Sequence, residues 1–530
     1  MKHIVDYFDS RYKPRQVQID FLNWVEENWE NYEVFCGLLP VAAGKSLAAL
    51  AIEEWAMNEK DMKSSLITPT KQLQAQYQEV HPLLPMLQGK ACFTCRSGAV
   101  NCKYTKDFKG EFCEGCSYIA NVMRCKASPI TLCNQHSYLA HMMQRPLIVV
   151  DECHNLLDFL TSLLTIKFYK EKDKYPDVDV KNKTATIATL LDWIGVKVQE
   201  YEADLERVKN AMKMSLGKPS KLSKELDDLE DKIERCNKVM ARLRSSPDDL
   251  LIAEKEDDVF KERKQKSIVI APVKLESAAK AYLWPCGIQK IVLVSATFNQ
   301  IDAAQLGLSG DRVGYFRCKS NIPPQRRPFV YSPLHDMGYK SQDKNMEAMA
   351  KDIQLICDAH PHEKGIVHMT YGMAIKIQKY LKDPRFLFHS QMDKDIQYRQ
   401  FRSGGGNEIL IASGMDEGID LAGPEFGFQI IAKVQYLSLG DPLIVAKKNE
   451  IPDFYVWEAI RSISQCYGRI CRGPEDKGVT YFLDSCLNML YNRKDLWPEW
   501  IQDARYKIEP SEFRKLMEKQ RDKNEHTQST

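Results

Sequence analysis

Two adjacent acids follow a short apolar run in the first half of the chain. Asp151 and Glu152 come directly after residues 147–150, Leu-Ile-Val-Val, and His154 lies two positions further on. A buried strand that ends in two carboxylates can present acids to a metal ion and to a water molecule. This stretch therefore predicts a site that hydrolyses a nucleotide.

A second motif, Gly44-Lys45-Ser46, lies between an apolar run at 34–39 and an alanine-rich stretch. Small residues let backbone N–H groups approach phosphates, the lysine reaches the terminal phosphates, and the serine hydroxyl ligates Mg²⁺ at a helix N-terminus. The full motif begins with glycine, but Leu39 stands there, and Ala42-Ala43 fill the loop. Alone, the stretch also fits an ordinary strand, turn and helix. Together with the acids at 151–152, it favours a phosphate loop.

Polar side chains that could complete such a site occur near both ends of the chain. Arg469 and Arg472 are three residues apart, a spacing that predicts one helical face, and Gln465 precedes them. Surface arginines usually face water, but beside a phosphate loop they are candidates to neutralise charge during phosphoryl transfer. Arg15 and Gln18 lie just before an amphipathic helix and could bind an adenine edge, although such pairs are common.

Seven of the sixteen cysteines fall between positions 92 and 133. Two Cys-x-x-Cys pairs, Cys92 with Cys95 and Cys113 with Cys116, are spaced as well for structural zinc as for an iron–sulfur cluster. The loop that holds them has little apolar material to fold around without a metal. Cys125 lies in a helical pattern, and the cysteine at 133 lies in a strand-like run, so both are expected in the core.

Alternating strands and helices must position these motifs. Apolar runs typical of buried strands precede the phosphate loop, the acids and Ser295-Ala296-Thr297, and the alternation resumes after a proline-rich linker around 321–328. Between the halves, apolar residues within 158–265 recur at alternating spacings of three and four, interrupted by Gly217-Lys218-Pro219-Ser220. That segment predicts a helical hairpin with charged outer faces, as in a solvated arm or a contact surface.

Length and composition describe a globular protein of several domains. The 530 residues are too many for one core and suggest about two to four domains. With 74 basic and 72 acidic residues, a nucleic acid would have to bind in a local groove. No apolar run reaches membrane-spanning length, and the N-terminus lacks the apolar core of a signal peptide. We therefore expect an intracellular protein with reduced thiols and no membrane contact.

The order of these motifs resembles that of superfamily 2 helicases, specifically the iron–sulfur DNA helicases of the XPD/DinG group. From about Tyr12 to Phe482, the chain carries a phosphate loop, a cysteine insert, Asp-Glu-x-His, a helical insert, Ser-Ala-Thr, Gly-x-Asp and Gln-x-x-Gly-Arg-x-x-Arg. The resemblance implies an α/β fold of two RecA-like P-loop motor lobes, each a parallel sheet flanked by helices. It also implies ATP between the lobes and translocation on single-stranded DNA, usually 5′ to 3′.

The resemblance further implies two inserts in the first lobe: a cluster domain at the duplex fork and a helical arch. We expect a monomer that unwinds forked DNA, with the arch as the surface for any protein partner. The implied segments are lobe 1 at 1–90, 126–160 and 266–320, the cluster insert at 91–125, the arch at 161–265 and lobe 2 at 321–530.

Site roles are implied residue by residue. Gly44, Lys45 and Ser46 would bind the ATP phosphates, Ser46 and Asp151 would hold Mg²⁺, and Glu152 would orient or deprotonate the attacking water. The sequence departs from the family at Cys153, where alanine is more usual, and at Ala42, which replaces a loop glycine. The other implied members are Arg469 and Arg472 as an arginine-finger pair, Gln465, His154, Ser295 and Thr297 as links to DNA-contacting elements, Glu417 and Asp420 lining the cleft, and Arg15 and Gln18 at the nucleotide edge.

A 4Fe–4S cluster is implied in the cysteine insert. The family places its first ligand soon after a Gly-Lys turn, here Gly89-Lys90, and its last just before an aromatic helix start, here Cys116-Ser117-Tyr118. The predicted ligands are therefore Cys95, Cys102, Cys113 and Cys116, with Cys92 and Cys125 as alternates.

Two other functions fit parts of the sequence. The same motor could act on RNA, or translocate without unwinding. Alternatively, the chain could be a zinc-stapled nucleic-acid-binding protein that no longer turns over ATP. Glu152 and the arginine pair argue against the second alternative, because a protein without hydrolysis has no use for either.

Overall fold

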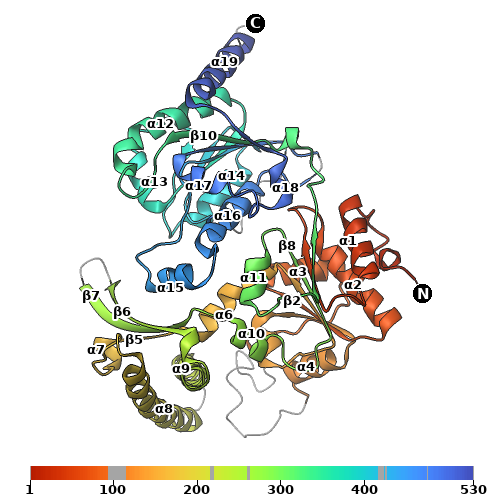
Figure 1. Cartoon of the computed structure of the whole chain (residues 1–530), viewed down its shortest axis with the longest axis vertical. Helices are drawn as coiled ribbons and strands as arrows, with labels where there is room; N and C mark the ends of the chain where they lie inside the picture. The colour runs from red at the N-terminus through yellow and green to blue at the C-terminus, as the bar shows by residue number, and fades with distance from the viewer. Residues whose placement is uncertain are drawn as a thin grey trace.

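The computed structural model describes residues 2–93, 115–214, 220–259, 263–415, 423, 426–473 and 475–528. They form two α/β lobes and a smaller insert beside them (Figure 1). The insert emerges from lobe 1, and the C-terminal helix α19 (Pro510–Gln528) projects from lobe 2 on the side away from lobe 1 (Figure 1).

Lobe 1 is built on a six-stranded parallel sheet with the order β3-β2-β4-β8-β1-β9. Three of its strands are buried at every position, as expected of a parallel sheet covered on both faces. The strands of the sheet are β1 Val34–Leu38, β2 Ser64–Thr68, β3 Ile130–Asn134, β4 Leu147–Asp151, β8 Lys290–Ser295 and β9 Val313–Arg317. The apolar runs predicted before the phosphate loop, the acids and Ser295 are therefore β1, β4 and β8.

Helices cover both faces of this sheet and enclose two apolar cores. One core contains the ring of Tyr77 and the alanines of the helix that follows the phosphate loop; the other contains Cys125, Cys133 and Cys153. The helices are α1 Gln16–Glu27, α2 Lys45–Lys60, α3 Lys71–Val80, α4 Ser117–Ala127, α5 Gln135–Ala140, α6 Leu156–Leu164, α10 Glu276–Tyr282 and α11 Gln300–Gln305.

Lobe 2 repeats the architecture with a seven-stranded parallel sheet in the order β12-β13-β11-β14-β15-β10-β16. Its strands are β10 Phe329–His335, β11 Lys364–His368, β12 Phe386–Leu387, β13 Ile409–Ala412, β14 Phe426–Ile431, β15 Val479–Asp484 and β16 Arg505–Lys507. Besides α19, its helices are α12 Gln342–Ala359, α13 Tyr371–Ile377, α14 Lys394–Ser403, α15 Pro442–Glu450, α16 Phe454–Tyr467, α17 Asn488–Tyr491 and α18 Glu499–Gln502.

The insert contains the predicted helical hairpin and also a sheet that the sequence reading missed. Helices α8 (Lys183–Met214) and α9 (Ser220–Ser245) pack on an antiparallel sheet of order β5-β7-β6, with the short helix α7 (Lys170–Asp173) beside it. The strands are β5 Ile166–Tyr169, β6 Leu250–Val259 and β7 Arg263–Pro272. The predicted boundary at 265/266 therefore cuts through β7, which pairs with insert strands and not with the lobe 1 sheet.

Strand order brings the sequence motifs together. The phosphate loop follows β1, the acids close β4, and Ser295 closes β8, which lies between those two strands. The carboxyl ends of neighbouring parallel strands open at one edge of the sheet, where α/β proteins bind their ligands. The fold thus places all three motifs at that edge.

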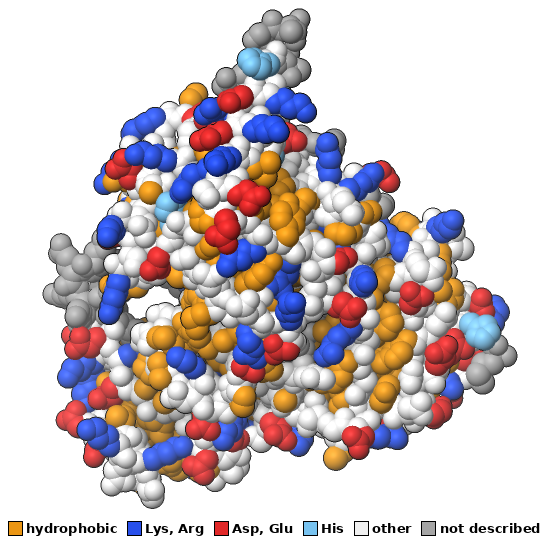
Figure 2. All heavy atoms as spheres, turned by 45° about the horizontal axis from the view of Figure 1, so that its top comes forward, with side chains coloured by type: hydrophobic (Ala, Val, Ile, Leu, Met, Phe, Trp, Pro, Cys, Tyr) orange, Lys and Arg blue, Asp and Glu red, His pale blue; other side chains and the backbone are white. Residues whose placement is uncertain are grey.

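Charge is spread over the surface. On the face seen in Figure 2, basic and acidic side chains are interspersed, in keeping with a formal net charge of +2. Among the helices described, none is both long enough and apolar enough to cross a bilayer.

Candidate active site between the lobes

A cavity of about 540 Å³ lies between the lobes at the carboxyl edge of the lobe 1 sheet. Lobe 1 contributes the phosphate loop, the acidic motif and the first turns of α3. Lobe 2 contributes the end of α16 and the segment after it. Among the lining residues are Arg15, Gly44, Lys45, Thr70, Gln76, Glu152, His154, Thr297, Gln465, Arg469 and Arg472.

The phosphate loop has the backbone that phosphate binding requires. Gly44 is left-handed, with φ of 74°, and α2 begins at the next residue, so the N-terminus of the helix opens toward the cavity. A Cβ atom at Gly44 would lie 2.5 Å from Nε2 of Gln18. Gln18 donates from that nitrogen to the carbonyl oxygen of Gly44, at 2.9 Å, and accepts from the backbone N–H of Arg15 at 2.7 Å.

Gln18 therefore has a different position from the one predicted. It is buried, both ends of its amide are bonded within the protein, and it holds the phosphate loop where we had expected it to bind an adenine edge. Arg15, in contrast, lines the cavity as predicted for a nucleotide contact.

Asp151 is buried at the end of β4 and is held by three hydrogen bonds. Its Oδ2 accepts from the hydroxyl of Ser46 at 2.9 Å and from the hydroxyl of Tyr77 at 2.7 Å, and its Oδ1 accepts from the backbone N–H of Glu152. Burial raises the pKa of Tyr77 well above its usual value, so the phenol keeps its proton. A serine hydroxyl beside a carboxylate offers the oxygen ligands that Mg²⁺ prefers, so these residues fit the predicted ion.

Glu152 adopts a left-handed backbone with φ of 50°, which is uncommon for a residue other than glycine and typical of functional sites. Its carboxylate lies 3.4 Å from Nζ of Lys45 and 3.4 Å from Nδ1 of His154. Burial acts to raise the pKa of Glu152, but Lys45 and His154 outweigh burial and lower it. Glu152 is therefore ionised at neutral pH and can accept a hydrogen bond from water.

His154 connects the acids to the neighbouring strand. Its Nδ1 lies 2.9 Å from Oγ of Ser295, at the end of β8, and the same hydroxyl oxygen accepts from the backbone N–H of Thr297. The acidic motif and the Ser-Ala-Thr motif are thus in direct contact, and the predicted link of these residues to DNA-contacting elements stays a prediction. A change at either motif would reach the other through this pair of hydrogen bonds.

Lobe 2 brings Gln465, Arg469 and Arg472 to the same cavity. Gln465 lies on the last turn of α16, but the helix ends at Tyr467, so the arginines follow the helix in an irregular segment. The prediction that both arginines share one helical face is therefore wrong. The helix stops at Gly468, where a Cβ atom would lie 2.5 Å from Val41 of the phosphate loop.

A buried polar contact also joins the lobes. Asp302 of α11, with no exposed surface, accepts from Nε1 of Trp457 on α16, with both carboxylate oxygens at 2.9 Å, and lies 3.7 Å from Arg461. Nε1 of Trp500 donates to the carbonyl oxygen of Ala296. The Ser-Ala-Thr motif thus touches lobe 2 directly.

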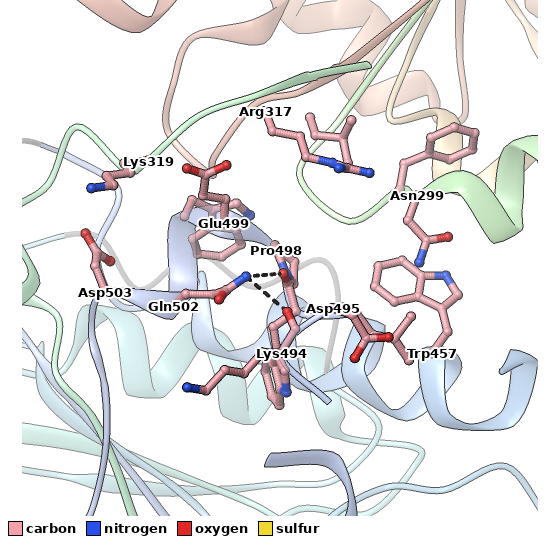
Figure 3. Close-up of a pocket in the computed structure, with 15 residues that line it drawn as sticks. Asn299, Arg317, Lys319, Trp457, Lys494, Asp495, Pro498, Glu499, Gln502 and Asp503 are labelled. Carbon is pink, nitrogen blue, oxygen red and sulfur yellow. Dashed lines mark hydrogen bonds between the residues drawn. The ribbon is translucent and has the colours of Figure 1, made fainter. Parts of the chain in front are cut away.

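A second cavity between the lobes, of about 530 Å³, lies beside these contacts (Figure 3). Asn299, Arg317 and Lys319 line it from lobe 1, and α18 with the segment preceding it lines it from lobe 2. Gln502 donates to two carbonyl oxygens of that segment, as drawn in Figure 3. It contains neither the phosphate loop nor the acidic motif, so the first cavity is the candidate nucleotide site.

Several predicted residues fall outside the described ranges. Glu417, Asp420 and three of the four predicted cluster ligands, Cys95, Cys102 and Cys113, belong to this group. The fourth, Cys116, is the N-cap residue of α4 and is partly buried. Cys92 is exposed, whereas Cys125 and Cys133 lie in the core of lobe 1 as expected. Burial raises the pKa of both core thiols, which disfavours the thiolate that a metal needs.

Sequence reasoning missed Tyr77, which binds Asp151 in the site, and Asp302, which joins the lobes beside it. Tyr77 lies seven residues beyond the turn at Thr70 and resembles any apolar position of an amphipathic helix. Asp302 resembles an ordinary helix-capping acid, and it does cap α11. No local signal marks either residue, because each acquires its role from a partner distant in the sequence.

Parts of the chain are similar to known helicases. Residues 353–504 match the family described as Helicase C-terminal domain. The IIH helicase subunit XPD of Dictyostelium discoideum is 32% identical over 109 residues, 19% of this chain and 14% of that protein. The ATP-dependent DNA helicase YoaA of Escherichia coli (strain K12) is 23% identical over 215 residues, 37% of this chain and 33% of that protein. The matches therefore span only a seventh to a third of these relatives.

Solved structures match over most of the chain. S. tokodaii Xpd4 gives a TM-score of 0.56 at 14% identity, covering 90% of this chain and 97% of that one. A structure titled XPD_Helicase gives 0.57 at 15% identity, covering 94% and 100%. At such low sequence identities, the structural similarity establishes the fold and not the function. It confirms two RecA-like lobes, and together with the sequence matches it confirms the resemblance to the XPD/DinG group.

Proposed function

We propose that this chain is an ATP-dependent DNA helicase of the XPD/DinG type, which translocates 5′ to 3′ on single-stranded DNA and unwinds duplex. The observation that carries the proposal is the meeting of two half-sites at one cavity. Lys45 and Glu152 come from lobe 1, and Gln465, Arg469 and Arg472 come from lobe 2. A site divided in this way depends on how the lobes are arranged, as a motor that couples hydrolysis to lobe movement requires.

In the proposed hydrolysis, different residues bind the phosphates, hold Mg²⁺ and activate water. Backbone N–H groups at the start of α2 and the ammonium of Lys45 would bind the phosphates of ATP. Ser46 and Asp151 would hold Mg²⁺, which neutralises phosphate charge when bound. Glu152, ionised and set apart from Asp151 by its left-handed backbone, would orient the attacking water and accept its proton.

The arginines make hydrolysis sensitive to lobe 2. Arg469 and Arg472 would stabilise the charge that develops on the transferred phosphoryl group, as arginine fingers do. Their approach is set by α16, which contacts lobe 1 through Trp457 and through Gly468 against Val41. ATP binding would therefore draw the lobes together, and loss of the terminal phosphate would release them.

We also propose a 4Fe–4S cluster held by Cys95, Cys102, Cys113 and Cys116. The burial of Cys125 and Cys133 in the lobe 1 core supports ligands drawn from the other cysteines of this region. The cluster domain would separate the strands at a fork, and contacts to the DNA backbone would make binding salt-dependent with little sequence preference. The arch would be available to protein partners of an intracellular monomer.

Whether the motor acts on DNA or on RNA is tested by measuring ATP turnover of the full chain with single-stranded DNA or RNA of the same sequence. We expect stronger stimulation by DNA, and unwinding of a fork with a 5′ single-stranded tail but not of its 3′ counterpart. Stronger stimulation by RNA would support an RNA helicase. Stimulation by DNA without strand separation would support a translocase.

The cluster is tested by metal analysis after anaerobic purification. We expect iron and a brown colour, which is lost when Cys113 is replaced by serine, while Cys133→Ser, a core control, keeps its iron. Stoichiometric zinc without iron would refute the cluster. Zinc together with no ATP turnover in the parent chain would favour the nucleic-acid-binding alternative.

A further inference from the structure

We propose that Tyr77 is a positioning residue for the carboxylate of Asp151, and through it for the Mg²⁺ that accompanies ATP. The inference rests on the proposed ATP hydrolysis and deepens it by adding a residue to the metal site. Tyr77 would touch neither the ion nor the nucleotide. It would act by fixing the carboxylate oxygen that it shares with Ser46.

The hydrogen bonds around Asp151 leave its carboxylate no freedom to turn. Oδ2 accepts hydrogen bonds from the hydroxyls of Ser46 and Tyr77, at 2.9 and 2.7 Å, and Oδ1 accepts one from the backbone N–H of Glu152 at 2.9 Å. The Ser46 hydroxyl is itself a candidate ligand of the ion, so its direction must adjust when Mg²⁺ binds. Tyr77 is the partner of Oδ2 that can stay unchanged in both states.

The tyrosine ring is fixed by its surroundings. Tyr77 is 1% exposed and belongs to the apolar core that also contains Leu66 of β2 and Val149 of β4. A ring packed in this way can aim its hydroxyl in one direction only, because core side chains occupy single rotamers. Supporting residues of this kind orient metal ligands, and their loss typically weakens metal binding about tenfold or more.

Helix α3 connects the Tyr77–Asp151 hydrogen bond to the nucleotide cavity. The same helix lines the nucleotide cavity through Gln72, Leu73 and Gln76 and is capped by Thr70, whose side chain accepts from the N–H of Leu73. One helix therefore contacts the cavity on one side and the metal-binding acid on the other. A ligand that shifts α3 would also shift the carboxylate of Asp151.

A purely structural role is the simpler alternative, because a buried phenol needs a hydrogen-bond partner wherever it lies. The chain offers a matched control. Tyr138 is equally buried in lobe 1, and its hydroxyl donates to the carbonyl oxygen of Leu283 at 2.8 Å, away from the cavity. Both tyrosines can be changed to phenylalanine, which removes the hydroxyl and keeps the ring.

The test titrates Mg²⁺ into the full chain with a non-hydrolysable ATP analogue and follows nucleotide binding, with thermal unfolding measured on the same samples. For Tyr77→Phe we expect the half-saturating Mg²⁺ concentration to rise about tenfold. Binding of the analogue without Mg²⁺ should be unchanged. For Tyr138→Phe we expect the parent Mg²⁺ requirement, even if its unfolding temperature falls as much.

The outcomes separate this inference from the proposed function. If the parent chain shows Mg²⁺-dependent nucleotide binding and Tyr77→Phe shows the same half-saturation, the positioning role is refuted and ATP hydrolysis stands. An equal rise of the half-saturating Mg²⁺ concentration in Tyr77→Phe and Tyr138→Phe would also refute the positioning role, because general destabilisation would then explain the rise. If the parent chain binds no nucleotide, both the role and the function fail.

Discussion

Asp151 and Glu152 are neighbours in the chain, yet their environments push their pKa values in opposite directions. Burial, and then the charge of Glu152, raise the pKa of Asp151, whereas Lys45 and His154 overcome burial at Glu152 and lower its pKa. The left-handed backbone at Glu152 turns the two carboxylates toward different partners. A cation beside Asp151 would favour its ionised form. These opposite shifts suit the proposed roles, in which Asp151 would bind the metal ion and Glu152 would act as base toward water.

Glu53 makes the stability of the folded state depend on pH, independently of catalysis. It lies on α2 with no exposed surface, and burial raises its pKa from 4.5 to about 8, although Ser64 and Arg145 act to lower it. The folded state therefore keeps a proton that the unfolded state releases near pH 4.5. Stability should fall as pH rises from about 5 to above 8, because the folded state binds more protons throughout that interval.

Replacing Glu53 with glutamine should flatten this dependence, since glutamine has no proton to release. The measurement is urea unfolding of the parent and variant at several pH values between 5 and 9. Glu27→Gln, at an exposed position of α1, serves as the control and should keep the parent slope. Equal slopes for the parent and Glu53→Gln would contradict the assignment.

The meeting of Lys45, Ser46, Asp151 and Glu152 could be predicted because each follows a recognisable strand, and parallel strands bring their ends together. Their roles in hydrolysis stay predictions. The contacts of Gln18 with Gly44 and of Tyr77 with Asp151 could not be predicted, because neither residue belongs to a motif that ends a strand. Side chains that act through another residue leave no pattern of their own.

At the scale of elements, the end of α16 decides where the arginines lie. The spacing of Arg469 and Arg472 predicts a helix, but the helix stops at Gly468, packed against Val41 of the phosphate loop. The backbone of Gly468 has φ of −72°, so its conformation would suit any residue. Its small size is what the contact requires, because the two lobes approach each other there.

Gly468→Ala should therefore reduce ATP turnover by separating the end of α16 from the phosphate loop. A Cβ atom at 2.5 Å from a β-branched side chain forces one element to move, and overpacking typically costs about 1–3 kcal/mol. We expect a fall in kcat of roughly tenfold, partly restored by Val41→Ala in the same chain. ATPase assays of the two single variants and the double variant test this. A double variant no better than Gly468→Ala alone would contradict the packing explanation.

The two parallel sheets were predictable, whereas the sheet of the insert was not. Strands buried on both faces leave continuous apolar runs in the sequence, and these predicted central lobe strands such as β1, β4 and β8. Strand β6 begins with an apolar run at 250–253, but charged residues such as Glu254 and Lys255 follow, so the sequence does not show that the strand continues through them. Strand β7 shows an apolar run from 267, but only pairing with β5 and β6 reveals that it belongs to the insert.

In the whole molecule, helix α16 connects the contact between the lobes to the candidate active site. Trp457 on this helix binds Asp302 of lobe 1, and Gln465 and the two arginines follow on the same element or just after it. The insert also reaches lobe 2, through Lys255 with Asp441 and Lys274 with Glu450. Those ion pairs are largely exposed and contribute little, about 0–1 kcal/mol each. The buried contact at Asp302 is the stronger tie.

Trp457→Phe should weaken this contact between the lobes, because it removes the indole N–H while keeping an aromatic ring. Removing the indole N–H leaves the buried carboxyl group of Asp302 without this hydrogen bond, which costs about 1–3 kcal/mol, so we expect kcat for ATP to fall about tenfold. Nucleotide affinity, set mainly by lobe 1, should change little. Trp497→Phe is the matched control, because Nε1 of Trp497 donates to Leu490 within lobe 2. Equal losses of kcat in both variants would contradict a specific role for the lobe contact.

In the proposed mechanism, Glu152 acts on water while the rest of the site binds ATP. Glu152→Gln keeps the shape of the side chain but cannot accept a proton, and loss of a general base typically costs about 100-fold or more. The decisive measurement compares ATP affinity and DNA-stimulated hydrolysis in the parent chain and this variant. We predict that ATP affinity stays within about threefold of the parent while hydrolysis falls at least about 100-fold. Turnover of ATP by Glu152→Gln at the parent rate would contradict the account.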